Sequence, residues 1–253
     1  MVRESLFSFL LFRECGQFLL DRLRPWACSN DRASSSISIP GGLMFVRPSW
    51  MPQSQQDVFN IIQQNPWGLL VSNGEDGPDV TNLPFVLDTT RGAKGVLTSH
   101  LSRANAHAAA LQNLQEPALA IFHGPSRYIT ASWYPGRDMP PTVYYSAVHC
   151  YGPLVFQDQD QLHEAVENLT QRSEKNIPQG WSTQEIPPAD ILRRLPAILG
   201  FELHIERLEA KFKLGQDEPK RDAMAVAERL LKSESPGDVA LGSMVYRYNE
   251  GRE

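Results

Sequence analysis

The stretch from Val96 to His123 constrains the fold more than any other part of the chain, because it predicts a strand, a helix and a second strand in close succession. Val96 to Thr98 is β-prone, and Ala104 to Leu114 has the best helix-forming composition in the sequence. Pro117 ends this helix, and Ala118 to Phe122 returns to a strand. A polar turn therefore lies where the first strand ends and the helix begins.

That turn carries residues that suit a phosphate or another anion. Ser102, Arg103 and Asn105 place a hydroxyl, a guanidinium and an amide at the start of the helix, where backbone N–H groups are also free. His100 precedes them at the strand end, where a ligand would lie. An ordinary helix cap followed by a surface arginine explains the same residues without a ligand. Both interpretations stay open at this point.

Residues 44 to 232 are predicted to form one domain. Two strands are predicted before the Val96 stretch, so three precede its helix, and a long β segment that follows the stretch is broken at Gly152-Pro153. Gly200 to Leu214 alternates apolar and polar residues and is predicted to be the last strand. Helices are expected at Ser54 to Gln64, Asp158 to Lys175, Ala189 to Leu195 and Pro219 to Lys232. Mostly antiparallel strands with helices between them favour an α+β fold, a small barrel with peripheral helices.

The two ends of the chain differ from this domain. Residues 1 to 43 join a short apolar run to a Ser-rich stretch, which predicts a disordered extension or a leader. Residues 233 to 253 are predicted to be a loose C-terminal tail. The apolar run is too short to span a bilayer, so no membrane association is expected. Three cysteines without paired spacing fit a reducing compartment, which favours the cytoplasm, with a mitochondrial leader as the alternative.

Composition and motifs exclude several classes of function. The net charge of -5 gives no general attraction to nucleic acid, and no helix-turn-helix pattern is present, so direct DNA binding is not supported. No histidines or cysteines have metal-ligand spacing, so no metal site is predicted. P-loop, GxSxG and GxGxxG motifs are also absent. Lys211 and Lys213 lie on one side of a strand end, where they either protect a sheet edge or face an anion.

An ordered set of seven sequence blocks points to a family. The blocks are MFVRPSWMP, NPWGLLVSNGEDG, TNLPFVLD, HLSRAN, IFHGPSRYITASWY, PPTVYYSAVHCYG and GFELHIERLEAKFKLGQD, and they run from Met44 to the region before Lys232. Together they resemble the PaiB-type transcriptional regulators, a branch of the FMN-binding split-barrel proteins related to pyridoxamine phosphate oxidase.

The resemblance implies a six-stranded, mostly antiparallel split β-barrel with peripheral helices that forms a homodimer and holds FMN at the dimer interface. It places the flavin phosphate at the turn containing Ser102 and Arg103, with Lys211 and Lys213 as second-rank contacts from the other subunit. The expected cofactor-binding residues are Arg103, Ser102, Asn105, His100, Thr81, Asn82, Lys211 and Lys213. No catalytic residue is identified.

Three functions follow from this resemblance. The first is a regulator that senses a flavin or another small molecule through a homodimer. The second is an FMN-dependent oxidoreductase acting on a small molecule, in which the flavin performs the chemistry. The third is a dimeric binding protein without flavin.

Overall fold

The computed structural model describes residues 44–253, so the expectation for residues 1 to 43 lies outside the part of the chain discussed below. The helices are α1 (Gln55–Gln64), α2 (Ala106–Gln112), α3 (Gln159–Glu174), α4 (Pro188–Arg194), α5 (Lys220–Leu231) and α6 (Pro236–Asn249). The strands are β1 (Trp67–Gly74), β2 (Gly77–Pro84), β3 (Val86–Asp88), β4 (Val96–Ser102), β5 (Ala118–Ile129), β6 (Thr142–Gly152), β7 (Leu154–Phe156), β8 (Ile198–His204) and β9 (Arg207–Lys213). Short 3-10 helices are η1 (Pro48–Trp50), η2 (Ala131–Trp133), η3 (Thr183–Glu185) and η4 (Leu195–Ala197).

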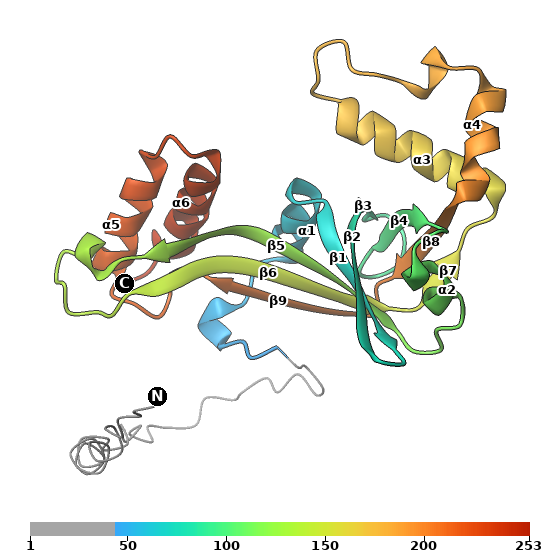
Figure 1. Cartoon of the computed structure of the whole chain (residues 1–253). Helices are drawn as coiled ribbons and strands as arrows, with labels where there is room; N and C mark the ends of the chain where they lie inside the picture. Colours follow the sequence, from blue (N-terminus) through green and yellow to red (C-terminus); the bar gives the residue numbers. More distant parts are fainter. Residues whose placement is uncertain (1–43) are drawn as a thin grey trace, which may run out of the picture. The chain divides into compact units, whose positions relative to one another are not determined.

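The strands form two antiparallel sheets, which confirms the α+β split-barrel fold. One sheet has five strands in the order β2-β1-β5-β6-β9, and the other has four in the order β3-β4-β8-β7. Strands β5 and β6 are the longest, and they continue beyond the barrel to the α5–α6 hairpin (Figure 1). The described residues therefore contain more strands than the six expected, because short strands flank the barrel and one predicted strand is divided.

The divided strand is Gly200 to Leu214, which was expected to be continuous. It forms β8 in the four-stranded sheet and β9 in the five-stranded sheet. At the junction, the N–H of Ile205 donates to Gly95 O (3.3 Å) and the N–H of Glu206 donates to Tyr151 O (2.9 Å). The chain passes from one sheet to the other here without a glycine or proline. The alternation of apolar and polar residues continues through the turn, so no signal in the sequence marks the end of the strand. The break at Gly152-Pro153, by contrast, separates β6 from β7 as predicted.

Three phenylalanine rings join the two sheets in the core. Phe122 comes from β5 and Phe201 from β8, and Phe85 lies between them at the β2–β3 junction. The Phe85 ring meets the other two edge to face, with centroids 5.4 Å and 6.3 Å away. All three side chains are buried, and Ile61 and Ile62 of α1 belong to the same core cluster. Burial of these rings contributes apolar area to the core that joins the two sheets.

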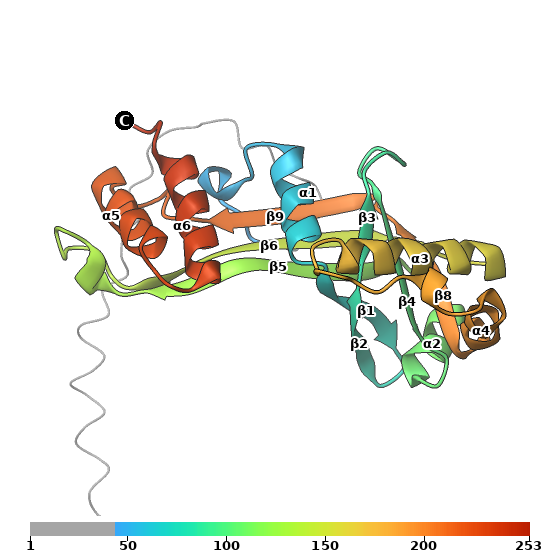
Figure 2. The ribbon, with the colours of Figure 1, turned by 90° about the horizontal axis from the view of Figure 1, so that it is seen from above.

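The prediction of a loose tail for residues 233 to 253 is wrong. Ser235 caps α6, and the helix packs against α5 and β5 (Figures 1 and 2). Leu241 and Val245 are fully buried, and a Cβ on Gly242 would come within 2.9 Å of Leu230 Cβ. The glycine thus permits close contact between two helices, while its low helix propensity made the segment look irregular in the sequence.

Helices α3 and α4 form a smaller helical excursion between β7 and β8 (Figure 1). Asp158 caps α3 with a capping box, and Leu162, Ile191 and Leu195 form a second small core that is separate from the barrel core. Within residues 44–253, no helix has both the length and the apolar character that crossing a membrane requires.

Candidate functional site

The turn after β4 is already held by its own backbone hydrogen bonds. The N–H of Arg103 donates to Ala197 O (2.9 Å), that of Ala104 to Ser102 Oγ (3.2 Å) and that of Asn105 to Ser102 O (3.0 Å). These three N–H groups therefore have partners within the protein and are not free for an anion. The Arg103 guanidinium and the Ser102 hydroxyl hydrogen remain available to one.

The helix after the turn is also shorter than predicted. It spans Ala106–Gln112 instead of Ala104 to Leu114, since Asn105 is the N-cap and its Oδ1 accepts the His107 N–H (3.0 Å). A helix of two turns has a small dipole, so the helix contributes little attraction for an anion. The positive charge of Arg103 is therefore the main attractive feature.

Arg103 is exposed, and its guanidinium has no hydrogen bond or ion pair with any residue in the described part of the chain. Its side chain lines a hollow of about 230 Å³ between the end of β4, the start of α3 and η4. Gln157 also lines the hollow, and its Oε1 is buried without a hydrogen-bond partner. The remaining lining residues are Asp158, Gln159, Leu162, Leu195, Pro196 and Ile198.

The hollow fits a phosphate group better than a whole flavin. Asp158 is the one acidic lining residue, and its Oδ1 accepts the Gln161 N–H (2.9 Å) at the N-terminus of α3, which offsets its charge. Sites that enclose a drug-sized ligand usually measure roughly 300–1,000 Å³. The single chain can therefore hold the phosphate end here, and the ring system needs another surface.

Thr81 and Asn105, two of the expected site residues, lie in contact with each other and with His107. His107 was not among the residues expected from the sequence. His107 is buried, and its Nδ1 lies 2.7 Å from Thr81 Oγ1 while its Nε2 lies 2.9 Å from Ser72 Oγ. Asn105 Nδ2 donates to Thr81 Oγ1 at 3.4 Å. Burial lowers the pKa of His107, partly opposed by the Asp79 carboxylate, so the ring is neutral at neutral pH.

His100 and Asn82 lie apart from this network. His100 shares its side of β4 with Ser102 and pairs with Gly200, and burial lowers the pKa of its imidazole. Asn82 follows Thr81 in β2, so strand alternation directs it to the opposite face, where it is exposed. Thr81 and Asn82 therefore cannot contact one ligand together within a single chain.

Lys211 and Lys213 lie on β9, the edge strand of the five-stranded sheet, whereas Arg103 follows β4 of the four-stranded sheet. Within one chain, the two lysines and Arg103 therefore do not form one site. The Lys211 ammonium is 4.7 Å from the centre of the Trp50 ring and 5.5 Å from that of Tyr145. Lys213 donates a hydrogen bond to Thr142 Oγ1. Within one chain, therefore, both lysines have contacts of their own at the edge of the five-stranded sheet.

Along β1, β2, β5 and the start of β6, the outer face of the five-stranded sheet is apolar and is not covered by residues 44–253, whereas at β9 Phe45 and Trp50 lie over Lys211. Strand pairing places one side of β1, β2, β5 and β6 on this face, and Trp67 and Tyr128 are 65% and 60% exposed there. Other apolar residues on the same face are Leu69, Val71, Val80, Leu119, Ile121 and Val143. A continuous apolar face of this kind usually marks a binding or assembly surface.

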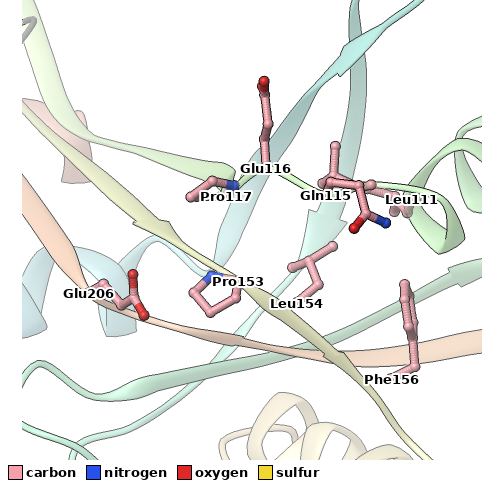
Figure 3. A pocket seen from close by; sticks show the side chains of 9 residues that line it. Leu111, Gln115, Glu116, Pro117, Pro153, Leu154, Phe156 and Glu206 are labelled. Carbon is pink, nitrogen blue, oxygen red and sulfur yellow. The ribbon is translucent and has the colours of Figure 1, made fainter.

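A second hollow, of about 170 Å³, lies between the end of α2 and the β6–β7 bend (Figure 3). Leu111, Leu154 and Phe156 line it together with Glu116 and Glu206. Two carboxylates at its rim repel a phosphate, so this hollow does not compete with the one at Arg103 for the phosphate of a flavin.

The comparisons with known proteins agree with the fold and identify the family. The model of a family described as "Putative FMN-binding domain" matches residues 44–207, which is more than half of the chain. The chain therefore belongs to this family, whose cofactor by resemblance is FMN, and the resemblance to PaiB-type proteins is confirmed.

Two curated relatives and one solved structure illustrate the likeness. "Protease synthase and sporulation protein PAI 2" of Bacillus subtilis is 28% identical over 193 residues, which cover 76% of this chain and 92% of the relative. "Uncharacterized protein YKL070W" of Saccharomyces cerevisiae is 30% identical over 128 residues, covering 47% of this chain and 75% of the relative. The crystal structure of conserved hypothetical protein Rv2991 from Mycobacterium tuberculosis has a TM-score of 0.50 at 11% identity, covering 70% of this chain and 94% of that chain, and supports the fold alone.

Proposed function

We propose that the protein binds FMN as a homodimer and that the Arg103 guanidinium and the Ser102 hydroxyl hold the flavin phosphate. The observation that carries this proposal is the unpaired, exposed guanidinium of Arg103 beside a hollow of phosphate size. A charge-assisted and bidentate contact is the strongest kind that a protein side chain offers to a phosphate. Family membership makes FMN the natural source of that phosphate.

A second copy of the chain would cover the outer face of the five-stranded sheet and complete the flavin site. Trp67, Val80 and Tyr128 leave apolar surface on this face, and the hollow at Arg103 is too small for the isoalloxazine ring. Lys211 and Lys213 are also on the outer face of this sheet. Tyr145 is on the same side of β6 as Val143, and Lys213 pairs with Tyr145. In a dimer they would flank the interface, where they can contribute positive charge from the other subunit.

The flavin-bound homodimer would act as a regulator whose state depends on flavin or a related small molecule. This part of the proposal rests on the relation to PaiB-type proteins, one of which is the sporulation protein PAI 2. A net charge of -5 favours action through protein contacts over direct binding to DNA.

The proposal is tested by titrating FMN into the wild-type protein and into Arg103→Ala and Arg103→Lys. Loss of a hydrogen-bonded charged contact costs about 1.5–3 kcal/mol, so Arg103→Ala should weaken FMN binding by about ten- to over a hundredfold. Arg103→Lys should recover part of that loss, since an ammonium lacks the planar fork. Arg172→Ala on α3, outside the hollow, is the matched control and should bind FMN like the wild type.

Equal FMN affinity in the wild type and in Arg103→Ala would reject the phosphate assignment. Light scattering at micromolar concentration tests the other half of the proposal. A dimer is expected, and a monomer with the outer sheet face uncovered would contradict it.

A further inference from the structure

We propose that His107 is a positioning residue of the flavin site, which ties α2 to the β1–β2 hairpin and so holds the Ser102–Arg103 turn in the conformation that receives a phosphate. This inference rests on the proposed function, and it identifies the group that orients the site. His107 itself does not touch the ligand in this account.

The hydrogen bonds of His107 run to two different strands. Ser72 belongs to β1 and Thr81 to β2, and their side chains point to the same face of the hairpin, on which α2 packs (Figure 2). Both ring nitrogens of His107 lie within 2.9 Å of a hydroxyl oxygen on these strands. Because hydroxyl groups both donate and accept, the pair satisfies either tautomer of the neutral ring.

The turn needs this second attachment. Its first end is fixed, since β4 pairs with β8 and the N–H of Arg103 donates to Ala197 O (2.9 Å). Its other end continues into α2, and a helix of seven residues is too short to be stable by itself. The bonds of His107 and the contact of Asn105 Nδ2 with Thr81 Oγ1 fix that end to the hairpin. Arg103 is thus held between two attached points.

The critical position for a test is Thr81, because its hydroxyl meets both His107 and Asn105. Thr81→Val keeps the side-chain volume and leaves one buried ring nitrogen of His107 without a partner. Thr81→Ser restores the hydroxyl. Ser99→Ala is the matched control, since it removes another buried hydroxyl, which donates to Pro84 O at 2.7 Å and does not contact α2.

The experiment compares FMN with riboflavin, which has the same ring system and no phosphate. If His107 positions the phosphate turn, Thr81→Val should weaken FMN binding by about three- to tenfold and leave riboflavin binding unchanged. Thr81→Ser and Ser99→Ala should bind FMN like the wild type. Ser72→Ala removes the partner of the other ring nitrogen of His107, and it should likewise weaken FMN binding and leave riboflavin binding unchanged. It replaces Thr81→Val as the test if Thr81→Val does not fold.

The outcomes separate this inference from the proposed function. If FMN binding depends on Arg103 and yet Thr81→Val and Ser72→Ala keep the wild-type preference for FMN over riboflavin, the positioning role of His107 is wrong while the phosphate site stands. An equal loss of affinity for FMN and riboflavin would show that the network only stabilises the fold. A wild-type protein that binds no FMN would overturn both proposals.

Discussion

The C-terminal helix is joined to the barrel by a buried hydrogen-bonded cluster, and Tyr248→Phe tests how much that cluster stabilises the fold. The Tyr248 hydroxyl donates to Asp57 Oδ2 of α1 (2.9 Å) and accepts the Gln53 N–H (3.1 Å). Arg247 contacts Asp57 Oδ1 at 2.6 Å. Burial and the Asp57 carboxylate raise the pKa of Tyr248 to about 12, so its hydroxyl remains protonated at neutral pH.

The size of the effect follows from what the substitution leaves behind. Asp57 is 5% exposed, so loss of the hydroxyl leaves one oxygen of a buried carboxylate without its partner. A hydrogen bond to a charged group contributes about 1.5–3 kcal/mol, and for a domain of this size each kcal/mol shifts Tm by roughly 2–4 °C. Tyr248→Phe should therefore lower Tm by about 3–12 °C.

Thermal unfolding followed by circular dichroism measures this difference. Tyr246→Phe is the matched control, because Tyr246 lies on the same helix and is 42% exposed. It should change the free energy of unfolding by no more than about 0.5 kcal/mol. Equal Tm values for the two variants would refute the reasoning and would show that α6 contributes little through this cluster.

Three further predictions concern charge and the domain boundary. Burial raises the pKa of Glu218, whose carboxyl group accepts a hydrogen bond from Tyr144. The stability that this group contributes at low pH is therefore lost as the pH rises through its folded-state pKa. Glu218→Gln should raise Tm at pH 8 and change it less at pH 4.5, and the opposite order in a pH series of melts would contradict this. Burial lowers the pKa values of His100, His107 and His149, so the unfolded chain takes up protons first and stability should fall as pH drops below about 6.5. The urea midpoint of unfolding should therefore be lower at pH 5.5 than at pH 7.5, and His107→Gln should make this difference smaller. An unchanged difference would count against a neutral, buried His107 ring. A chain beginning at Met44 should fold, with a Tm close to that of the full chain, since the described domain begins there; a marked loss of Tm would contradict it.

Patterns with strong local punctuation were predicted correctly from the sequence. Gly152-Pro153 separates β6 from β7 as expected, and α1 fills the range Ser54 to Gln64 in which a helix was expected, between the Ser54 cap and Asn65-Pro66. Each of these signals acts through the backbone within a few residues, so it needs no knowledge of the tertiary structure.

The errors arose where tertiary contacts decide the structure. The turn at Ile205 and Glu206 depends on hydrogen bonds to Gly95 and Tyr151, which are distant in sequence. Helix α6 depends on close contact between Gly242 and α5.

The candidate site shows the same division. The local sequence identified Ser102, Arg103 and Asn105, whereas the role of His107 depends on Ser72 and Thr81, 35 and 26 residues away. The one available signal was the spacing Asn105-x-His107 at the start of an apolar helix, which places the imidazole on the buried side. A search for metal-ligand spacing does not detect a histidine that is bonded by hydroxyl groups.

The central claim is that this chain binds FMN through its phosphate, and titration of the wild-type protein with FMN tests it most directly. Flavin fluorescence and absorbance should change saturably, to a stoichiometry of one FMN per chain, and riboflavin should bind more weakly because it lacks the phosphate that Arg103 contacts. No saturable change with an excess of FMN, or equal binding of FMN and riboflavin, would contradict the account.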